Sequence, residues 1–292
     1  MSERRPTIES FFHEDTSTYS YVAWDPATRI AALIDPVLDY DAAAGATATG
    51  FAGRQLAFIH DQGLTLRWIL ETHAHADHLS AAPFFKESFP EADLAIGRGI
   101  TRVQETFSRI FNLGDEFATN GSQFDRLLDE GDRLPLGNLE IEVIATPGHT
   151  SDSLTYLIGD AGFVGDSIFM PDMGTARCDF PGGDAAVLYD SIQKLFRLPD
   201  ETRLFMCHDY APGGREHRNV TTVGEERANN KHVGGGKSLE EFRRMREERD
   251  ATLGAPKLLY PSVQVNIRAG QLPPAEANGI RYMKVPLDKF GN

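Results

Sequence analysis

Three histidines and an aspartate are packed into six consecutive positions of the chain, from His73 to His78. The segment reads Thr-His-Ala-His-Ala-Asp-His-Leu and begins at Thr72. Neutral imidazole and carboxylate bind borderline divalent metals, and few other structural demands would place these side chains so close together. The segment follows an apolar run, residues 66–70, that is typical of a buried strand leading into a loop. Because such loops have a rigid support and face clefts, we expect a metal site here.

Three further side chains of the same kind occur later, where apolar, strand-like runs end. His149 follows residues 139–144, Asp166 follows a short apolar run, and His208 ends the run that starts at residue 204. Any one of them alone could be a capping or surface residue. Together with the first cluster, they indicate loops that meet at one edge of a sheet. The other four histidines are interpreted as ordinary polar residues: His13, His60, His217 and His232.

The seven residues, taken in chain order, resemble the signature of the metallo-β-lactamase superfamily: His73, His75, Asp77, His78, His149, Asp166 and His208. The resemblance covers about residues 7–230. It implies an α/β fold, the αββα sandwich, in which two mixed β-sheets pack face to face, flanked by helices, with metal bound at one edge. The superfamily contains hydrolases, nucleases and oxygenases, so the fold does not determine the reaction.

The charge balance argues against the nucleases. The chain has 29 Lys and Arg against 43 Asp and Glu, a net charge of −14, so a nucleic-acid backbone would be repelled overall. The two cysteines, Cys178 and Cys207, cannot form a disulfide framework, which favours a reducing compartment. There is no apolar segment of a secretory signal near the start and no apolar run of about 20 residues. We expect a cytoplasmic protein that binds neither nucleic acid nor membranes.

The rest of the sequence predicts alternating strands and helices in one domain, residues 1–292. A helix is expected over residues 49–61, ending before Gly63, and apolar periodicity predicts helices over residues 100–111 and 184–198. A capping box of Ser238 and Glu241 predicts another that runs to about residue 250. A C-terminal extension from about residue 233 to 292 is expected to pack on the main domain. Its tail, residues 261–290, contains several prolines and is expected to be extended.

Further segments resemble the persulfide dioxygenases, a branch related to glyoxalase II. The more specific ones are residues 177–180, Arg-Cys-Asp-Phe, and residues 208–210, His-Asp-Tyr. The resemblance implies a mononuclear enzyme, with one Fe(II) per chain, that oxidises glutathione persulfide with O₂ to sulfite and glutathione. Carried over by position, the iron ligands would be His73, His149 and Asp166. A homodimer is expected from the same resemblance.

Two histidines and one carboxylate on one face of Fe(II) leave positions open for sulfur and O₂. The other four residues would orient the ligands by hydrogen bonds or hold a second metal: His75, Asp77, His78 and His208. For glutathione, the resemblance implies contacts by Arg177, Tyr210 and Lys231. Arg177 has an alternative role, a structural pair with Asp179. Cys178 is interpreted as a buried, unreactive cysteine.

The main alternative is a dinuclear zinc hydrolase of glyoxalase II type, which cleaves a glutathione thioester with a metal-bridging hydroxide. In it, His73, His75 and His149 would bind one metal, and Asp77, His78 and His208 the other, with Asp166 bridging. The chain beyond Asn230 does not resemble the helical domain with which that enzyme binds glutathione, which favours the dioxygenase. A flavodiiron-like oxidoreductase would carry Glu at the position of His75, and structural zinc prefers cysteine-rich sites.

Overall fold

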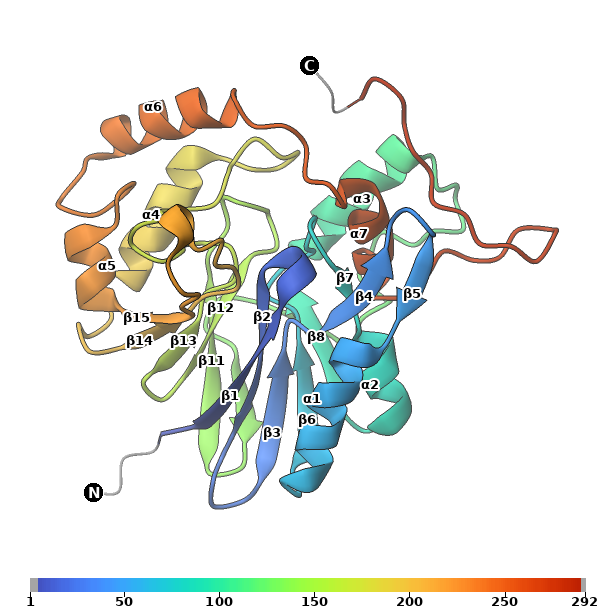
Figure 1. Ribbon diagram of the computed structural model, residues 1–292, viewed down its shortest axis with the longest axis horizontal. Coiled ribbons are helices and arrows are strands. Elements are labelled where there is room, and N and C mark those ends of the chain that lie inside the picture. The colour runs from blue at the N-terminus through green and yellow to red at the C-terminus, as the bar shows by residue number, and fades with distance from the viewer. Residues whose placement is uncertain (1–4, 290–292) are drawn as a thin grey trace.

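Two mixed β-sheets form the framework of the chain (Figure 1). The computed structural model describes residues 5–289, and within them each of these sheets has six strands. The first sheet contains, in spatial order, β1 (Thr7–His13), β2 (Thr18–Trp24), β3 (Ile30–Ile34), β6 (Thr65–Leu70), β8 (Asp93–Gly97) and β9 (Arg126–Leu128). The second contains β10 (Arg133–Leu136), β11 (Leu139–Ala145), β12 (Leu154–Ile158), β13 (Ala161–Phe163), β14 (Arg203–Phe205) and β15 (Val220–Thr222).

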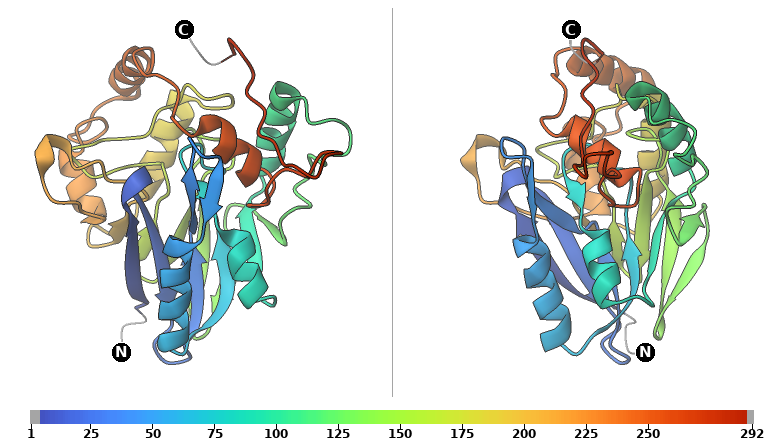
Figure 2. Two further views of the ribbon diagram at one scale, coloured as in Figure 1. Left: turned by 45° about the vertical axis from the view of Figure 1, so that its right-hand side comes forward. Right: turned by 90° about the vertical axis from the view of Figure 1, so that its right-hand side faces the viewer.

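The two sheets pack face to face, because alternate residues of each strand point into a shared core. Tyr21 and Trp68 of the first sheet lie in one buried cluster with Tyr156 and Phe163 of the second. In the right-hand view of Figure 2 the blue strands of the first sheet and the green strands of the second form two adjacent layers. A smaller sheet, in the order β5 (Ala46–Ala48), β4 (Val37–Asp41) and β7 (Leu79–Ser80), accompanies them.

Helices cover the outer face of each sheet. Leu33 of the first sheet shares a buried cluster with Phe107, and Leu204 of the second shares another with Leu188 and Phe242. The helices are α1 (Gly50–Asp61), α2 (Ala82–Ser88), α3 (Ile100–Phe111), α4 (Ala185–Leu195), α5 (Val223–Asn229), α6 (Leu239–Asp250) and α7 (Leu259–Asn266). This arrangement confirms the αββα sandwich expected from the sequence, and α1, α3, α4 and α6 lie where the sequence predicted helices.

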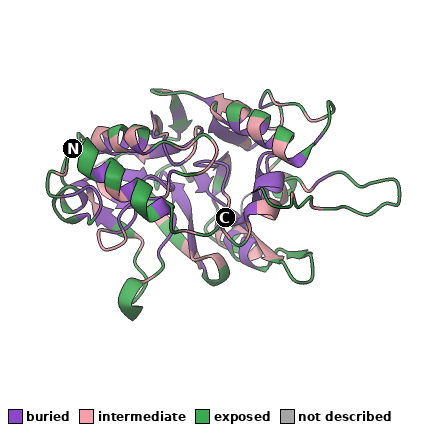
Figure 3. Cartoon of the chain, turned by 90° about the horizontal axis from the view of Figure 1, so that it is seen from above, coloured by how far each residue is buried: buried purple, intermediate pink, exposed green. Residues whose placement is uncertain are grey.

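The C-terminal extension differs from its prediction in one respect. The tail was expected to be extended from residue 261, but α7 continues to Asn266. Pro261 lies in the first turn of α7, where its missing N–H is not needed, and Leu259 and Val263 bury their side chains in the core of the first sheet. Beyond α7 the chain has no further helix up to residue 289, and it projects as the largely exposed arm at the right of Figure 3.

The extension packs on the sandwich in two places, α6 on α4 and α7 on β7 and α3. Residues 1–4 and 290–292, among them the last residue of the expected tail, lie outside the described residues. That residues 1–292 form one domain stays a prediction. Within residues 5–289, no helix combines the length and the apolar character that a bilayer crossing requires.

Candidate metal centre

The seven predicted metal-binding residues come together at one edge of the sandwich, as the sequence indicated. Residues 73–78 form the loop between β6 and β7, His149 lies between β11 and β12, and Asp166 and His208 follow β13 and β14. Because β13 and β14 are parallel, their carboxyl ends reach the same edge, and Asp166 and His208 meet there. The ligand atoms form two groups, each with its atoms within 4.8 Å of one another: His73, His149 and Asp166, and His75, Asp77, His78 and His208.

Two glycines allow the loops to approach so closely. Gly165, just before Asp166, has a positive φ of 51°, and a Cβ there would lie 2.6 Å from the hydroxyl oxygen of Thr72. Gly148, just before His149, has φ of 132°, and a Cβ would lie 2.3 Å from the backbone nitrogen of Leu188. Any side chain at these positions would push the ligand loops away from the β6–β7 loop or from α4.

In the first group, the free nitrogens of two imidazoles face one carboxylate. The Nε2 atoms of His73 and His149 lie 3.9 and 3.7 Å from Oδ2 of Asp166. Nδ1 of His149 donates to the backbone carbonyl of Arg177 at 2.7 Å, which leaves the lone pair on Nε2. Nε2 of His73 is buried and has no hydrogen-bond partner, and burial, together with His75, lowers the pKa of His73 well below its usual value. A neutral, unpaired imidazole beside a carboxylate fits a divalent metal ion.

The second group contains a tight pair of its own. Nε2 of His208 lies 2.9 Å from Oδ2 of Asp77 and 3.3 Å from Oδ1 of Asp166. Burial alone would lower the pKa of His208, but these two carboxylates raise it to about 10. Nδ1 of His75 and both ring nitrogens of His78 are buried without a hydrogen-bond partner. The second group therefore also offers free ligand atoms.

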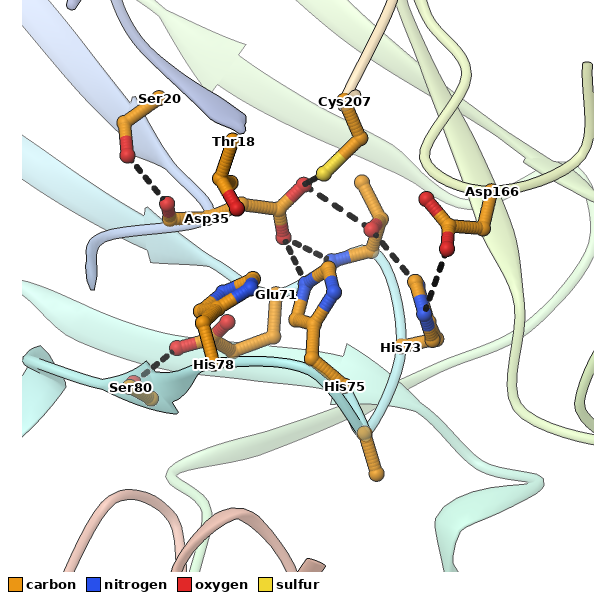
Figure 4. A network of polar contacts seen from close by, with 12 residues as sticks. Thr18, Ser20, Asp35, Glu71, His73, His75, His78, Ser80, Asp166 and Cys207 are labelled. Atoms are coloured by element: carbon orange, nitrogen blue, oxygen red, sulfur yellow. Dashed lines mark hydrogen bonds and ion pairs between the residues drawn. The ribbon is translucent and has the colours of Figure 1, made fainter. Parts of the chain in front are cut away.

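Asp35 is an organising residue that the sequence analysis missed (Figure 4). Its carboxylate accepts hydrogen bonds from the backbone N–H of Thr72 at 2.7 Å, from the Thr72 hydroxyl at 2.9 Å and from Nε2 of His75 at 3.0 Å. It directly follows the strand β3, which is parallel to β6, so it reaches the same edge. Its position at the end of an apolar run is the same signal that marked Asp166.

Asn266, at the end of α7, also holds the loop that carries the histidines. Its Nδ2 donates to the carbonyl oxygens of His75 and His78, each at 2.8 Å, and its Oδ1 accepts from the N–H of Ser80 at 2.8 Å. All three backbone groups are thereby satisfied inside the protein. The C-terminal extension is thus part of the structure that shapes the site.

A cavity of about 340 Å³ opens at the first group. Its lining includes His149, Asp166 and Asp77 together with the apolar side chains of Phe169 and Phe180. Three arginines and a histidine also contribute to its wall: Arg177, Arg246, Arg249 and His232. The metal-binding residues therefore face a cavity of a size that suits a small organic ligand.

The predicted glutathione contacts have different surroundings. Tyr210 lines the cavity, is 55 % exposed and stacks on His208 with 5.9 Å between the ring centroids. Arg177 lines it too, but its guanidinium donates to both carboxylate oxygens of Asp179 at 2.6 Å and to the carbonyl of Gly254 at 2.7 Å. The structural pair weighed as an alternative is thus present. Lys231 is exposed, and its role in binding stays a prediction.

The sequence indicated that His232 is an ordinary polar residue, and the structure corrects this interpretation. It is buried, lines the cavity and accepts a hydrogen bond at Nδ1 from the N–H of Thr175 at 2.9 Å. Burial and the nearby Arg246 lower its pKa to about 3, so the ring is neutral and carries its hydrogen on Nε2. Cys178 is buried, and burial raises the pKa of its thiol, as expected of an unreactive cysteine.

A family model of the metallo-beta-lactamase superfamily matches residues 13–208. The chain belongs to this superfamily. A probable metallo-hydrolase of Burkholderia pseudomallei is 52 % identical over 97 % of the chain and 99 % of that protein. Glyoxylase B2 of Dictyostelium discoideum is 48 % identical over 96 % of the chain and 97 % of that protein.

More distant relatives of this superfamily member carry a different name. The mitochondrial persulfide dioxygenase ETHE1 of Mus musculus is 30 % identical over 92 % of the chain and 91 % of that protein. The crystal structure of ETHE1 from Myxococcus xanthus has a TM-score of 0.73 and 36 % identity, and the match covers 91 % of this chain and all of that one. The chain is thus an enzyme of the metallo-beta-lactamase superfamily with relatives named for hydrolysis and for persulfide oxidation.

Proposed function

We propose that this enzyme oxidises glutathione persulfide with O₂ at one Fe(II) held by His73, His149 and Asp166. The observation that carries the proposal is the grouping of these three ligand atoms beside the cavity. Two imidazoles and one carboxylate with open positions are the ligand set of non-haem Fe(II) oxygenases. The similarity to the Myxococcus xanthus and mouse ETHE1 proteins supports the same reaction.

The proposed reaction converts GSSH, O₂ and H₂O into GSH and H₂SO₃. The S–S bond breaks, and the terminal sulfur is oxidised as dioxygen is reduced. Fe(II) at this site would supply neighbouring coordination positions for the persulfide sulfur and for O₂. The chain orients its ligands through the Arg177 carbonyl on His149, and Phe180, whose ring lies 5.6 Å from that of His149, helps to exclude water from the cavity.

The pairing in the second group favours a single metal ion. Asp77 and His208 lie 2.9 Å apart and can pair with each other without a second cation. In this proposal His75, Asp77, His78 and His208 orient the iron ligands and bound water.

The second candidate function is hydrolysis of a glutathione thioester by two zinc ions. The unpaired ring nitrogens of His75 and His78 favour it, because they could bind a second ion. The names of the Burkholderia and Dictyostelium relatives point in the same direction. The two functions differ in the metal count and in the need for O₂.

One experiment separates them. The purified protein is loaded with Fe(II) or with Zn(II), and O₂ uptake on adding glutathione persulfide is measured in parallel with hydrolysis of S-lactoylglutathione. We expect O₂ uptake with sulfite formation at about one iron per chain, and little thioester hydrolysis in either form. Thioester hydrolysis at two zinc ions per chain, with no O₂ uptake by the iron form, would establish the second candidate instead.

A further inference from the structure

Three guanidinium groups line the metal cavity, and two of them are already neutralised. Arg177 pairs with Asp179 through two hydrogen bonds of 2.6 Å. Arg246 is 1 % exposed, and its Nη2 donates to Asp250 at 2.6 Å and its Nη1 to the carbonyl of Thr175 at 3.1 Å. These two arginines hold α6 and the loop at residues 175–180 in place, and neither has its charge free for a ligand.

Arg249 is the third, and its situation differs. It is exposed, lines the cavity, and within residues 5–289 no hydrogen bond or ion pair engages its guanidinium. Phe242, Arg246 and Asp250 are the buried residues of α6, so they fix which face of the helix meets the protein. Arg249 is three residues beyond Arg246 and therefore neighbours it on the helix surface. Helix α6 is thus fixed by its buried residues, and it places the unpaired guanidinium of Arg249 at the cavity wall.

The surroundings of His232 show that this part of the cavity is electropositive although the chain carries a net charge of −14. After burial, the groups that lower the pKa of His232 are all cationic: Arg246, Lys231, Arg249 and Lys237. The neutral His232 also offers an Nε2–H donor, because its Nδ1 accepts from Thr175. A planar guanidinium next to a neutral N–H donor suits a carboxylate.

We infer that Arg249 binds a carboxylate of the thiol substrate, so that the enzyme selects persulfides of carboxylate-bearing thiols over those of uncharged thiols. The inference rests on the proposed function for the reacting group, but the binding of the carboxylate itself does not depend on the metal. Arg249 contributes to specificity from the extension, a part of the chain outside the superfamily match at residues 13–208.

The first test measures binding of glutathione to the metal-free protein by calorimetry. We expect Arg249→Ala to weaken glutathione binding about tenfold and Arg249→Lys to restore part of it. The diethyl ester, which has no free carboxylate, should bind the variant and the parent equally, and the monoethyl ester, which keeps one carboxylate, shows which of the two Arg249 binds. Arg244→Ala is the matched control, because Arg244 is exposed on the same helix and lies outside the lining of the cavity. Circular dichroism and melting temperature check that each variant is folded.

The second test uses steady-state O₂ uptake by the Fe(II) form. For glutathione persulfide we expect Arg249→Ala to raise KM about tenfold with kcat nearly unchanged. For 2-hydroxyethyl persulfide, which has no carboxylate, we expect the same substitution to change neither KM nor kcat. Equal effects of the Arg244 and Arg249 substitutions, or an Arg249 effect of the same size on the uncharged persulfide, would overturn the inference. A parent enzyme that consumes no O₂ would refute the proposed function, whereas the glutathione-binding result would still decide the role of Arg249.

Discussion

Nδ1 of His149 donates a hydrogen bond of 2.7 Å to the backbone carbonyl of Arg177. This bond fixes the tautomer of the imidazole and turns Nε2 toward Asp166. The side chain of Arg177 in turn donates to the carbonyl of Gly254 in the extension. The orientation of a proposed metal ligand is therefore linked, through one residue, to the chain that follows α6.

Replacing one histidine of each group should distinguish ligands from their neighbours. We expect His149→Ala to lose most bound iron and all measurable O₂ uptake, because it removes one of three ligands. His208→Ala should retain close to one iron per chain, with O₂ uptake reduced by roughly 10- to 100-fold. Metal analysis, O₂ uptake and circular dichroism on both variants provide the comparison. Loss of iron in the His208 variant, with normal iron in the His149 variant, would contradict the ligand assignment.

Asn266→Ala should destabilise the protein and loosen the metal site together. The substitution leaves the carbonyls of His75 and His78 and the N–H of Ser80 without their partner inside the protein. We expect the free energy of unfolding to fall by about 3 kcal/mol and metal affinity to fall with it. Urea unfolding and metal competition measure the two effects. Asn278→Ala, at an exposed position, should change stability by no more than about 0.5 kcal/mol.

Two ion pairs with the same spacing on α6 should differ strongly in their effect on stability. Arg246 and Asp250 are buried, whereas Arg243 and Glu247 are more than half exposed. Arg246→Ala leaves a buried carboxylate unpaired and should lower the free energy of unfolding by about 3–5 kcal/mol. Arg243→Ala should lower it far less, because solvent screens the exposed pair. Similar losses in urea unfolding of the two variants would show that Arg246 does not anchor the helix.

Glu226 should make the protein less stable as the pH rises. Burial raises the pKa of its carboxyl from 4.5 to about 8, although a hydrogen bond from Asn230 opposes the shift. Between pH 4.5 and 8 the folded state holds a proton that the unfolded state has lost, so the free energy of unfolding falls across this range. Urea unfolding of the metal-free protein at pH 5, 6.5 and 8 measures the slope.

The matched variants for this pH dependence are Glu226→Gln and Glu225→Gln. The first should reduce the slope, because it removes the buried titrating group. The second changes an exposed neighbour whose charge contributes less than burial to the raised pKa of Glu226, so it should reduce the slope much less. An unchanged slope in the Glu226 variant would assign the pH dependence to other groups.

The sequence predicted which side chains meet at the edge of the sandwich, because the signals for them are local. Each ligand stands where an apolar strand ends, and the dense motif at residues 73–78 needs no tertiary information to be noticed. Helix α3 was equally accessible, since Ile100, Val103, Phe107 and Phe111 recur at helical spacing on its buried face.

The cavity wall was harder to predict, because it depends on how distant elements dock. The capping box located α6, but nothing local indicates that Arg246 and Arg249 face the metal site. Asn266 lies in a segment whose prolines favoured an extended structure, and its partners His75 and His78 lie 191 and 188 residues earlier in the chain. Side chains that act across such separations are determined by packing rather than by local pattern.

The bonds from Asn266 to the loop at residues 75–78 also set an order of events during translation. The strands that carry the histidines are made early, but the amide that completes their loop is made almost at the end of the described chain. A nascent polypeptide that has not yet exposed α7 leaves those carbonyls unbonded. The loop can therefore adopt its final, fully hydrogen-bonded geometry only after α7 has been made.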